Sequence, residues 1–242
     1  MPDSAATEPV PRTDANSQQA HQDLLAKAKA GGIDLYFLGD SITRRWGCTD
    51  PQYSDLLEHW RECFHGWNAA NFGWGGDGIE HVRWRVENGE LAGVNPKVIV
   101  LLAGTNNVGG EIGPEGKVDQ VVAGMAALIE TCRLLAPGAT VVLMAIFPRN
   151  DHVSVLPEIE AINRGYAKLA DGDRVRFLNI NDRLADANGR LHDGIAPDGL
   201  HLARPGYQIW ADALRPILTE RLGLPAEIDT APPPTGDPSA TA

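Results

Sequence analysis

Short apolar runs recur along the chain, separated by longer stretches in which apolar residues return every three or four positions. The clearest run, residues 97–103, reads Lys-Val-Ile-Val-Leu-Leu-Ala and is continuously apolar after its first residue. Such a β-branched run is typical of a strand that is buried on both faces of a sheet. Four further runs are shorter or weaker, and we predict strands there as well, at 33–38, 67–72, 140–146 and 175–180.

Helical spacing dominates between these runs. Apolar residues from Val118 to Cys132 form one stripe, which Pro137-Gly138 should end, and shorter stripes cover 159–169 and 207–218. Pro216 lies within the last stripe and is expected to kink or weaken that helix. Alternating helices and doubly buried strands predict an α/β domain in which helices cover both faces of a parallel sheet.

Both ends of the chain lack this periodicity. The first residues are rich in Ala, Pro, Ser, Thr and Asp, and the last contain a Pro-Pro-Pro run. We therefore predict a disordered tail at 1–18, a single domain at 19–224 and a disordered Pro-rich tail at 225–242.

Composition narrows the class of protein. The chain of 242 residues is 43% hydrophobic, enough for a substantial core, and its net charge of -11 disfavours nucleic acid or an anionic membrane surface as the main partner. Three cysteines without metal-like spacing favour reduced thiols, with a Cys48–Cys63 bridge as the alternative and Cys132 on a buried helix face.

The sequence predicts no membrane span, because no run reaches the ~20 apolar residues that a span needs. Residues 1–4 lack the basic and apolar regions of a secretion signal. We expect a cytoplasmic protein as the chain is written, or a secreted or periplasmic one if a signal has been removed.

Unusual residues stand beside the predicted elements, where parallel α/β folds bind their ligands. Gly-Asp-Ser at 39–41 follows the first strand, and the glycine-rich segment 71–77 includes the end of the second. Gly-Thr-Asn-Asn at 104–107 follows the third strand, and Asp-Gly-Leu-His at 198–201 precedes the last helix. We call these segments the four blocks.

Together the four blocks supply the parts of a serine hydrolase. Ser41, on a strand-to-helix turn, is the candidate nucleophile. His201 is the candidate base, because among the seven histidines only it follows a carboxylate by three residues with a glycine between them. Asp198 would orient its ring, and the backbone N–H groups of Ser41 and Gly76 with the Asn106 amide would stabilise the oxyanion.

Other interpretations remain open at this point. His81 and His192 are competing bases, although neither follows an acid in this way. Residues 73–78 also match the dinucleotide pattern G-x-G-x-x-G, but they follow the second strand rather than the first, and no acid stands some 20 residues later.

The order and spacing of the four blocks resemble the SGNH (GDSL) hydrolase superfamily. Within this superfamily, the chain is similar to the bacterial esterases that resemble the catalytic subunit of platelet-activating-factor acetylhydrolase Ib. This similarity includes residues 81–85, 88–91 and 146–149. The resemblance implies a flavodoxin-like three-layer α/β/α sandwich with a five-stranded parallel sheet. It also implies an acyl-enzyme esterase with a Ser-His-Asp triad and no metal or organic cofactor, and dimers in this family make a homodimer one candidate assembly.

Three residues near the blocks are candidate substrate-binding residues, each with a structural alternative. Asp40 adjoins the nucleophile and also suits a role in the turn. Trp74 stands where a smaller aliphatic residue is common in the SGNH superfamily. It either lines the substrate site or fills the core. Arg44 either binds an anionic substrate or lies on a solvated helix face.

The resemblance favours a small-molecule ester, most of all a short-chain or acetyl ester, as the substrate. A carbohydrate O-acetyl esterase acting on acetylated sugars or xylan is the first alternative. A lysophospholipase, a thioesterase and a non-catalytic binding module are the remaining ones.

Overall fold

The computed structural model describes residues 6–241, which contain one five-stranded sheet. All strands are parallel, in the spatial order β2-β1-β3-β4-β5. The strand order reverses between β1 and β3, so the loops after these two strands diverge and leave room for a ligand. Each strand lies where the apolar runs predicted one: β1 Leu35–Gly39, β2 Ala69–Gly73, β3 Val98–Leu102, β4 Thr140–Met144 and β5 Val175–Leu178.

Alternate residues of the central strands face opposite layers. Tyr36 and Leu38 of β1 belong to one hydrophobic cluster, whereas Leu35 and Phe37 belong to the other. The middle strands β1, β3 and β4 are buried along their whole length. This explains why the strands read as continuous apolar runs rather than as an alternating pattern.

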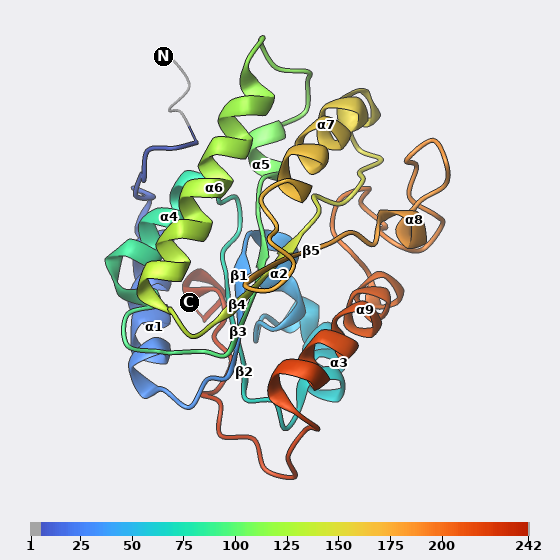
Figure 1. The fold of residues 1–242 in the computed structure, drawn as a ribbon. Helices are drawn as coiled ribbons and strands as arrows, with labels where there is room; N and C mark the ends of the chain where they lie inside the picture. Colours follow the sequence, from blue (N-terminus) through green and yellow to red (C-terminus); the bar gives the residue numbers. More distant parts are fainter. Residues whose placement is uncertain (1–5, 242) are drawn as a thin grey trace.

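Two layers of helices complete the sandwich (Figure 1). The layer that packs on Tyr36 and Leu38 contains α1 Ala15–Ala30, α4 Ile79–Arg85, α6 Lys117–Leu135 and α7 Leu156–Ala167. The opposite layer contains α2 Ser41–Trp46, α3 Ser54–Phe64 and α9 Arg204–Leu222. The predicted three-layer α/β/α fold is confirmed.

Shorter elements connect these layers. They include one-turn helices after β3 and β5, a π-helix that continues α4, and 3-10 turns, the last of them near the C-terminal end. Their bounds are α5 Thr105–Val108, α8 Asn181–Leu184, η1 Pro51–Tyr53, η2 Val86–Glu90, η3 Val153–Val155 and η4 Pro238–Thr241.

Helix α9 continues through Pro216 to Leu222, so the proline does not end the helix. Proline removes one backbone donor from the helix. Leu214 and Leu218, on either side, are both fully buried in the core. Pro216 itself is exposed, so packing of the buried side holds the helix together across the missing bond.

Described parts of both predicted tails contact the domain. Helix α1 begins at Ala15, inside the predicted tail of residues 1–18, and the Asp14 side chain caps it by accepting from Ser17 N at 2.8 Å. At the other end, Ala226 N donates to Gly66 O at 2.9 Å and the Thr235 hydroxyl accepts from a buried lysine, Lys27. We therefore propose a domain that includes these segments; residues 1–5 and 242 lie outside the described residues.

Side-chain burial bears on several further predictions. The three cysteines are free thiols and all are buried, Cys132 completely. Trp46 and Trp210 are fully buried core residues, but Trp84 is only half-buried and lies against His21. Within the described residues, no helix is both long and apolar enough to span a bilayer.

Candidate active site

The turn between β1 and α2 presents Ser41 at the edge of the sheet. Asp40 is the N-cap of α2, and its Oδ1 accepts from Ile42 N at 2.9 Å. Gly39 allows the close approach of β3, since a Cβ atom there would lie 2.2 Å from Leu102 O. Ser41 is the first residue of the helix, so its N–H has no partner within the helix and stays available for an anion.

Ser41, His201 and Asp198 form a hydrogen-bonded chain. The distance from Ser41 Oγ to His201 Nε2 is 2.9 Å, and His201 Nδ1 lies 2.7 Å from Asp198 Oδ2. A carboxylate only accepts, so Nδ1 carries the proton and Nε2 is left to accept from the serine hydroxyl. This is the geometry that a base needs to activate a serine nucleophile.

The pKa values of the two partners suit these roles. Burial works against ionisation of Asp198, but donation from the backbone N–H groups of His201 and Leu200 outweighs it and places the pKa of Asp198 well below its ordinary value. Burial lowers the pKa of His201, while its bond to Asp198 opposes the shift. His201 therefore stays neutral, as a proton acceptor must, near pH 7.

The segment after β4 holds the turn that carries Asp198 and His201, and further contacts tie the neighbouring elements together. Asn150 N, in the segment after β4, donates to Gly199 O at 2.7 Å. Arg149, in the same segment, forms an ion pair with Asp151 and donates to Gly109 O, just after α5. From α9, the Tyr207 hydroxyl donates to the Ile42 carbonyl of α2 at 2.7 Å.

The glycine-rich segment after β2 runs beside the nucleophile. Gly76 adopts a φ of 77°, a left-handed conformation that favours glycine, and Gly76 N makes no hydrogen bond among the residues that the structure describes. Asn106 Nδ2 donates to Asp77 O at 2.8 Å, which ties the amide to the same segment, and its second N–H has no partner within residues 6–241. The predicted oxyanion donors thus lie on segments that contact one another.

A buried ion cluster supports this segment from below, and sequence reasoning missed it. Arg85 donates to Asp77 Oδ2 at 2.8 Å, pairs with Glu90, and donates to Gly39 O at 3.3 Å. His21 Nδ1 lies 2.7 Å from the second Glu90 oxygen. Because Arg85 contacts both the strand before Ser41 and the segment that holds Asn106, it fixes the two halves of the site relative to each other.

Arg12, from the predicted N-terminal tail, also contacts the glycine-rich segment. Its Nη1 donates to Gly75 O at 3.2 Å and lies 3.5 Å from Asp77 Oδ1. A Cβ atom on Gly76 would lie 3.0 Å from the same nitrogen. Arg12 comes from a segment without hydrophobic periodicity, yet it covers the loop that contains Gly76, a candidate oxyanion donor.

The three candidate substrate-binding residues take structural positions. Asp40 is 1% exposed, and burial raises its pKa to about 7 against the hydrogen bond from Ile42. Trp74 is buried and donates from Nε1 to Ser17 Oγ. Arg44 pairs with Asp50 at 2.6 Å and stacks on the Trp74 ring. The contacts favour the structural alternative for Asp40 and Trp74, whereas the Arg44 side chain is only 12% exposed and so does not lie on a solvated helix face.

The competing bases lie elsewhere. His81 accepts from Gly78 N through Nδ1 and thereby caps the start of α4. His192 is exposed, and its backbone bonds to Leu184 O in an irregular segment. Among the described residues no group of three or more His, Cys, Asp or Glu side chains is arranged to hold a metal ion.

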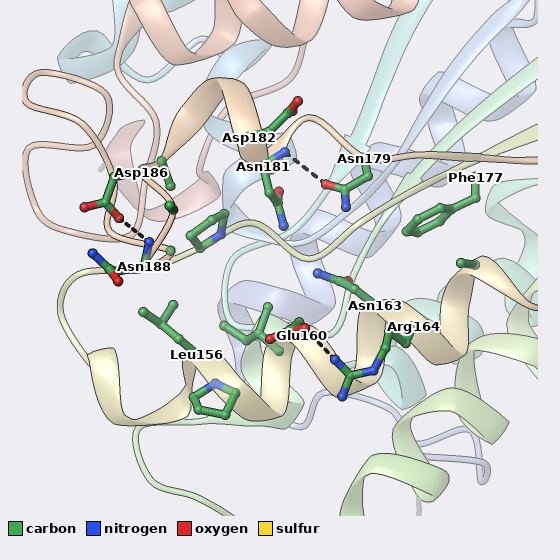
Figure 2. A pocket seen from close by; sticks show the side chains of 17 residues that line it. Leu156, Glu160, Asn163, Arg164, Phe177, Asn179, Asn181, Asp182, Asp186 and Asn188 are labelled. Carbon is green, nitrogen blue, oxygen red and sulfur yellow. Dashed lines mark hydrogen bonds and ion pairs between the residues drawn. The ribbon is translucent and has the colours of Figure 1, made fainter.

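Two hollows differ in their relation to the triad. A cavity of about 570 Å³ lies between α7 and the segment after β5, and Figure 2 shows Asn163, Asn179 and Asn181 around it. No residue of the triad lines that cavity. A smaller hollow of about 240 Å³ is lined by Asp198 and His201, so the smaller one adjoins the candidate chemistry.

Comparisons with known proteins identify the family of the chain. A family model described as the GDSL-like lipase/acylhydrolase family matches residues 37–209. Human platelet-activating factor acetylhydrolase IB subunit alpha1 is 32% identical over 228 residues, covering 91% of this chain and 92% of the human protein.

Solved structures share the fold. A GDSL-like lipase from Bacteroides thetaiotaomicron superposes with a TM-score of 0.65 at 18% identity, covering 83% of this chain and 97% of the other. An acetyl xylan esterase superposes with a TM-score of 0.57 at 20% identity, covering 77% of this chain and 100% of the other.

Proposed function

The chain belongs to the GDSL-like lipase/acylhydrolase family and is a hydrolase, and we propose that it is a serine esterase of short-chain carboxylic esters, acetyl esters above all. One observation carries the proposal: the Ser41 hydroxyl lies 2.9 Å from a histidine nitrogen whose ring is held by a carboxylate at 2.7 Å. The name of the acetylhydrolase relative supports the acetyl group.

The first half of the reaction forms an acyl-enzyme. Ser41 Oγ attacks the ester carbonyl while His201 Nε2 takes the hydroxyl proton, and Asp198 stabilises the imidazolium. The negative charge on the carbonyl oxygen is met by Ser41 N, Gly76 N and the free N–H of Asn106. His201 then gives its proton to the alcohol as the carbon–oxygen bond breaks, and Ser41 keeps the acyl group.

The second half releases the acid. Water enters where the alcohol left, His201 accepts one of its protons, and the hydroxide attacks the acyl carbon against the same donors. Collapse of the second tetrahedral intermediate returns the proton to Ser41 and frees the carboxylic acid. Over both halves, one ester and one water give one alcohol and one carboxylic acid, and Ser41 and His201 return to their starting protonation states.

A carbohydrate O-acetyl esterase is the second candidate. The hollow beside His201 is lined by an aromatic ring, Tyr53, and by charged groups such as Asp55 and Arg204, which suit the hydroxyls and flat faces of a sugar. An acetyl xylan esterase among the fold neighbours is consistent with that interpretation.

The test compares esters that differ in one part at a time. Turnover of p-nitrophenyl acetate, butyrate and octanoate measures the preference for acyl-chain length. The rates of acetate release from acetylated xylan and from a 2-acetyl phospholipid are then compared to measure the preference for the alcohol part. We expect acetate to be preferred. A preference for octanoate would contradict the short-chain proposal.

Variants test the assignment of residues. Ser41→Ala and His201→Ala should each lower kcat by about 10³-fold or more, whereas His192→Ala, a matched histidine outside the triad, should keep its activity. Activity above about a tenth of wild type in either triad variant would contradict the mechanism. An organophosphate should label wild-type Ser41, as read by peptide mass, and fail to label Ser41→Ala.

A further inference from the structure

Arg45 reaches the acid of the proposed triad from the helix that carries the nucleophile. Its Nη1 donates to Asp198 Oδ2 at 3.2 Å, and the same oxygen accepts from His201 Nδ1 at 2.7 Å. The other oxygen, Oδ1, accepts from the backbone of Leu200 and His201. The neighbouring Arg44 is turned away toward Asp50, so the contact with Asp198 is particular to Arg45.

The guanidinium is held from a second side. Its central carbon lies 5.0 Å from the centre of the Tyr53 ring, within the range of a cation–π contact. Arg45 and Tyr53 line the small hollow together with Asp198 and His201. The position of the positive charge is therefore set by the surrounding residues as well as by the ion pair itself.

This ion pair does little for the stability of the fold. The side chain of Arg45 is 26% exposed and that of Asp198 is 48% exposed, and pairs of this kind contribute little in water. The imidazole of His201, in contrast, is only 14% exposed, so it is less shielded from the charges around it. The main effect of Arg45 is therefore on the protonation of the His201 ring.

Three charged groups act on His201, each from a different segment. Asp198 lies on its own turn, Asp151 follows β4, and Arg45 projects from α2. The two carboxylates favour the imidazolium, whereas the guanidinium disfavours it. Burial lowers the pKa of His201, and Arg45 adds to that lowering.

We propose that Arg45 is a positioning residue of the triad, which shares the Asp198 carboxylate with His201 and keeps the imidazole in its proton-accepting form in mildly acidic solution. The proposal rests on the serine esterase function above. Arg45 touches neither the ester nor the nucleophile in this scheme. It acts through Asp198 on the pH range in which the base is available.

The direct test is the pH profile of Arg45→Gln. The acid limb of kcat/KM reports protonation of the base in the free enzyme. Without the guanidinium the imidazolium forms more readily, so the limb should move to higher pH. The ratio of wild-type to variant kcat/KM should then be largest near pH 5 and smallest near pH 8. Arg45→Lys, which keeps the charge, should restore most of the wild-type limb.

Two comparisons distinguish the effect of the Arg45–Asp198 contact from the effect of any positive charge in the hollow. Arg204→Gln removes a positive charge from the same hollow, but Arg204 pairs with Glu62 and not with Asp198, so its acid limb should match wild type. Added NaCl screens Asp198 and Asp151 in both proteins but Arg45 in wild type alone, so the gap between the acid limbs of wild type and Arg45→Gln should narrow. A limb in Arg45→Gln that coincides with wild type, or an equal shift in Arg204→Gln, would overturn the proposal.

A second readout does not need an ester at all. NMR titration of the His201 ring in wild type and Arg45→Gln measures its protonation directly, in the folded protein and without turnover. A raised midpoint in the variant supports the role of Arg45 even if the substrate proposed above is wrong. Equal midpoints overturn it even if the esterase assays succeed.

Discussion

Replacing Arg85 with methionine tests how much the buried ion cluster contributes to the fold. Arg85 is 3% exposed, and its two carboxylate partners, Asp77 and Glu90, are fully buried. Removing one member of a buried pair leaves an uncompensated charge and costs about 3–5 kcal/mol. For a domain of this size each kcal/mol lowers Tm by about 2–4 °C, so Tm should fall by about 6–20 °C.

The loss of stability in Arg85→Met should be larger at neutral pH than at acidic pH. Burial raises the pKa of Asp77 even though Arg85 opposes the shift, so the variant should raise it further. A carboxyl group with a higher pKa in the folded than in the unfolded state destabilises the fold while it is ionised. The penalty of Arg85→Met relative to wild type should therefore be full at neutral pH and shrink as the pH falls and Asp77 takes up a proton.

Thermal unfolding followed by circular dichroism at pH 5 and pH 8 measures both effects. Arg83→Met is the matched control, because Arg83 lies on the same helix but pairs with Glu87 on the surface, and such a pair contributes about 0–1 kcal/mol. A drop in Tm no larger than that of the control, or a penalty that is the same at both pH values, would refute the reasoning about the cluster.

Two more predictions concern the edge of the sheet. Asn106→Ala should lower kcat by about 10²–10³-fold with little change in Tm, as measured by steady-state kinetics and melting, and a loss below about tenfold would count against an oxyanion role. Asp40 has a pKa of about 7 in the folded protein, so its ionisation should cost stability as the pH rises from about 4 to 7. Asp40→Asn, which still caps the helix, should lose less stability over that interval in urea unfolding; parallel curves would contradict the burial argument.

The sheet could be predicted from the sequence because its signal is local. Residues 98–103 are apolar and begin with three β-branched residues because both faces of β3 are covered, and β1 and β4 are covered on both faces as well. The weaker run at 67–72 also formed a strand, although it begins two residues later, at Ala69. That α9 continues past Pro216 was not visible in the sequence, because the packing of α9 depends on residues far away in the sequence.

The triad residues could be proposed because Asp198 and His201 are three residues apart and Ser41 follows a strand. Their supports could not be found in that way. Nothing near them in the sequence indicates that Arg85 is buried or that Arg12 reaches Gly75. Ion pairs between distant segments carry no periodicity, so only the folded arrangement reveals them.

The acid and the base of the site share a single turn, close to the end of the chain. Asp198 binds the backbone of His201 as well as its ring, so the two arrive together, and Tyr207 then locks the following helix onto the helix of Ser41. Ser41 and His201 are 160 positions apart in the sequence, so on a ribosome the nucleophile is synthesised well before its proposed base. A nascent chain stalled before this turn would carry a serine with no base beside it.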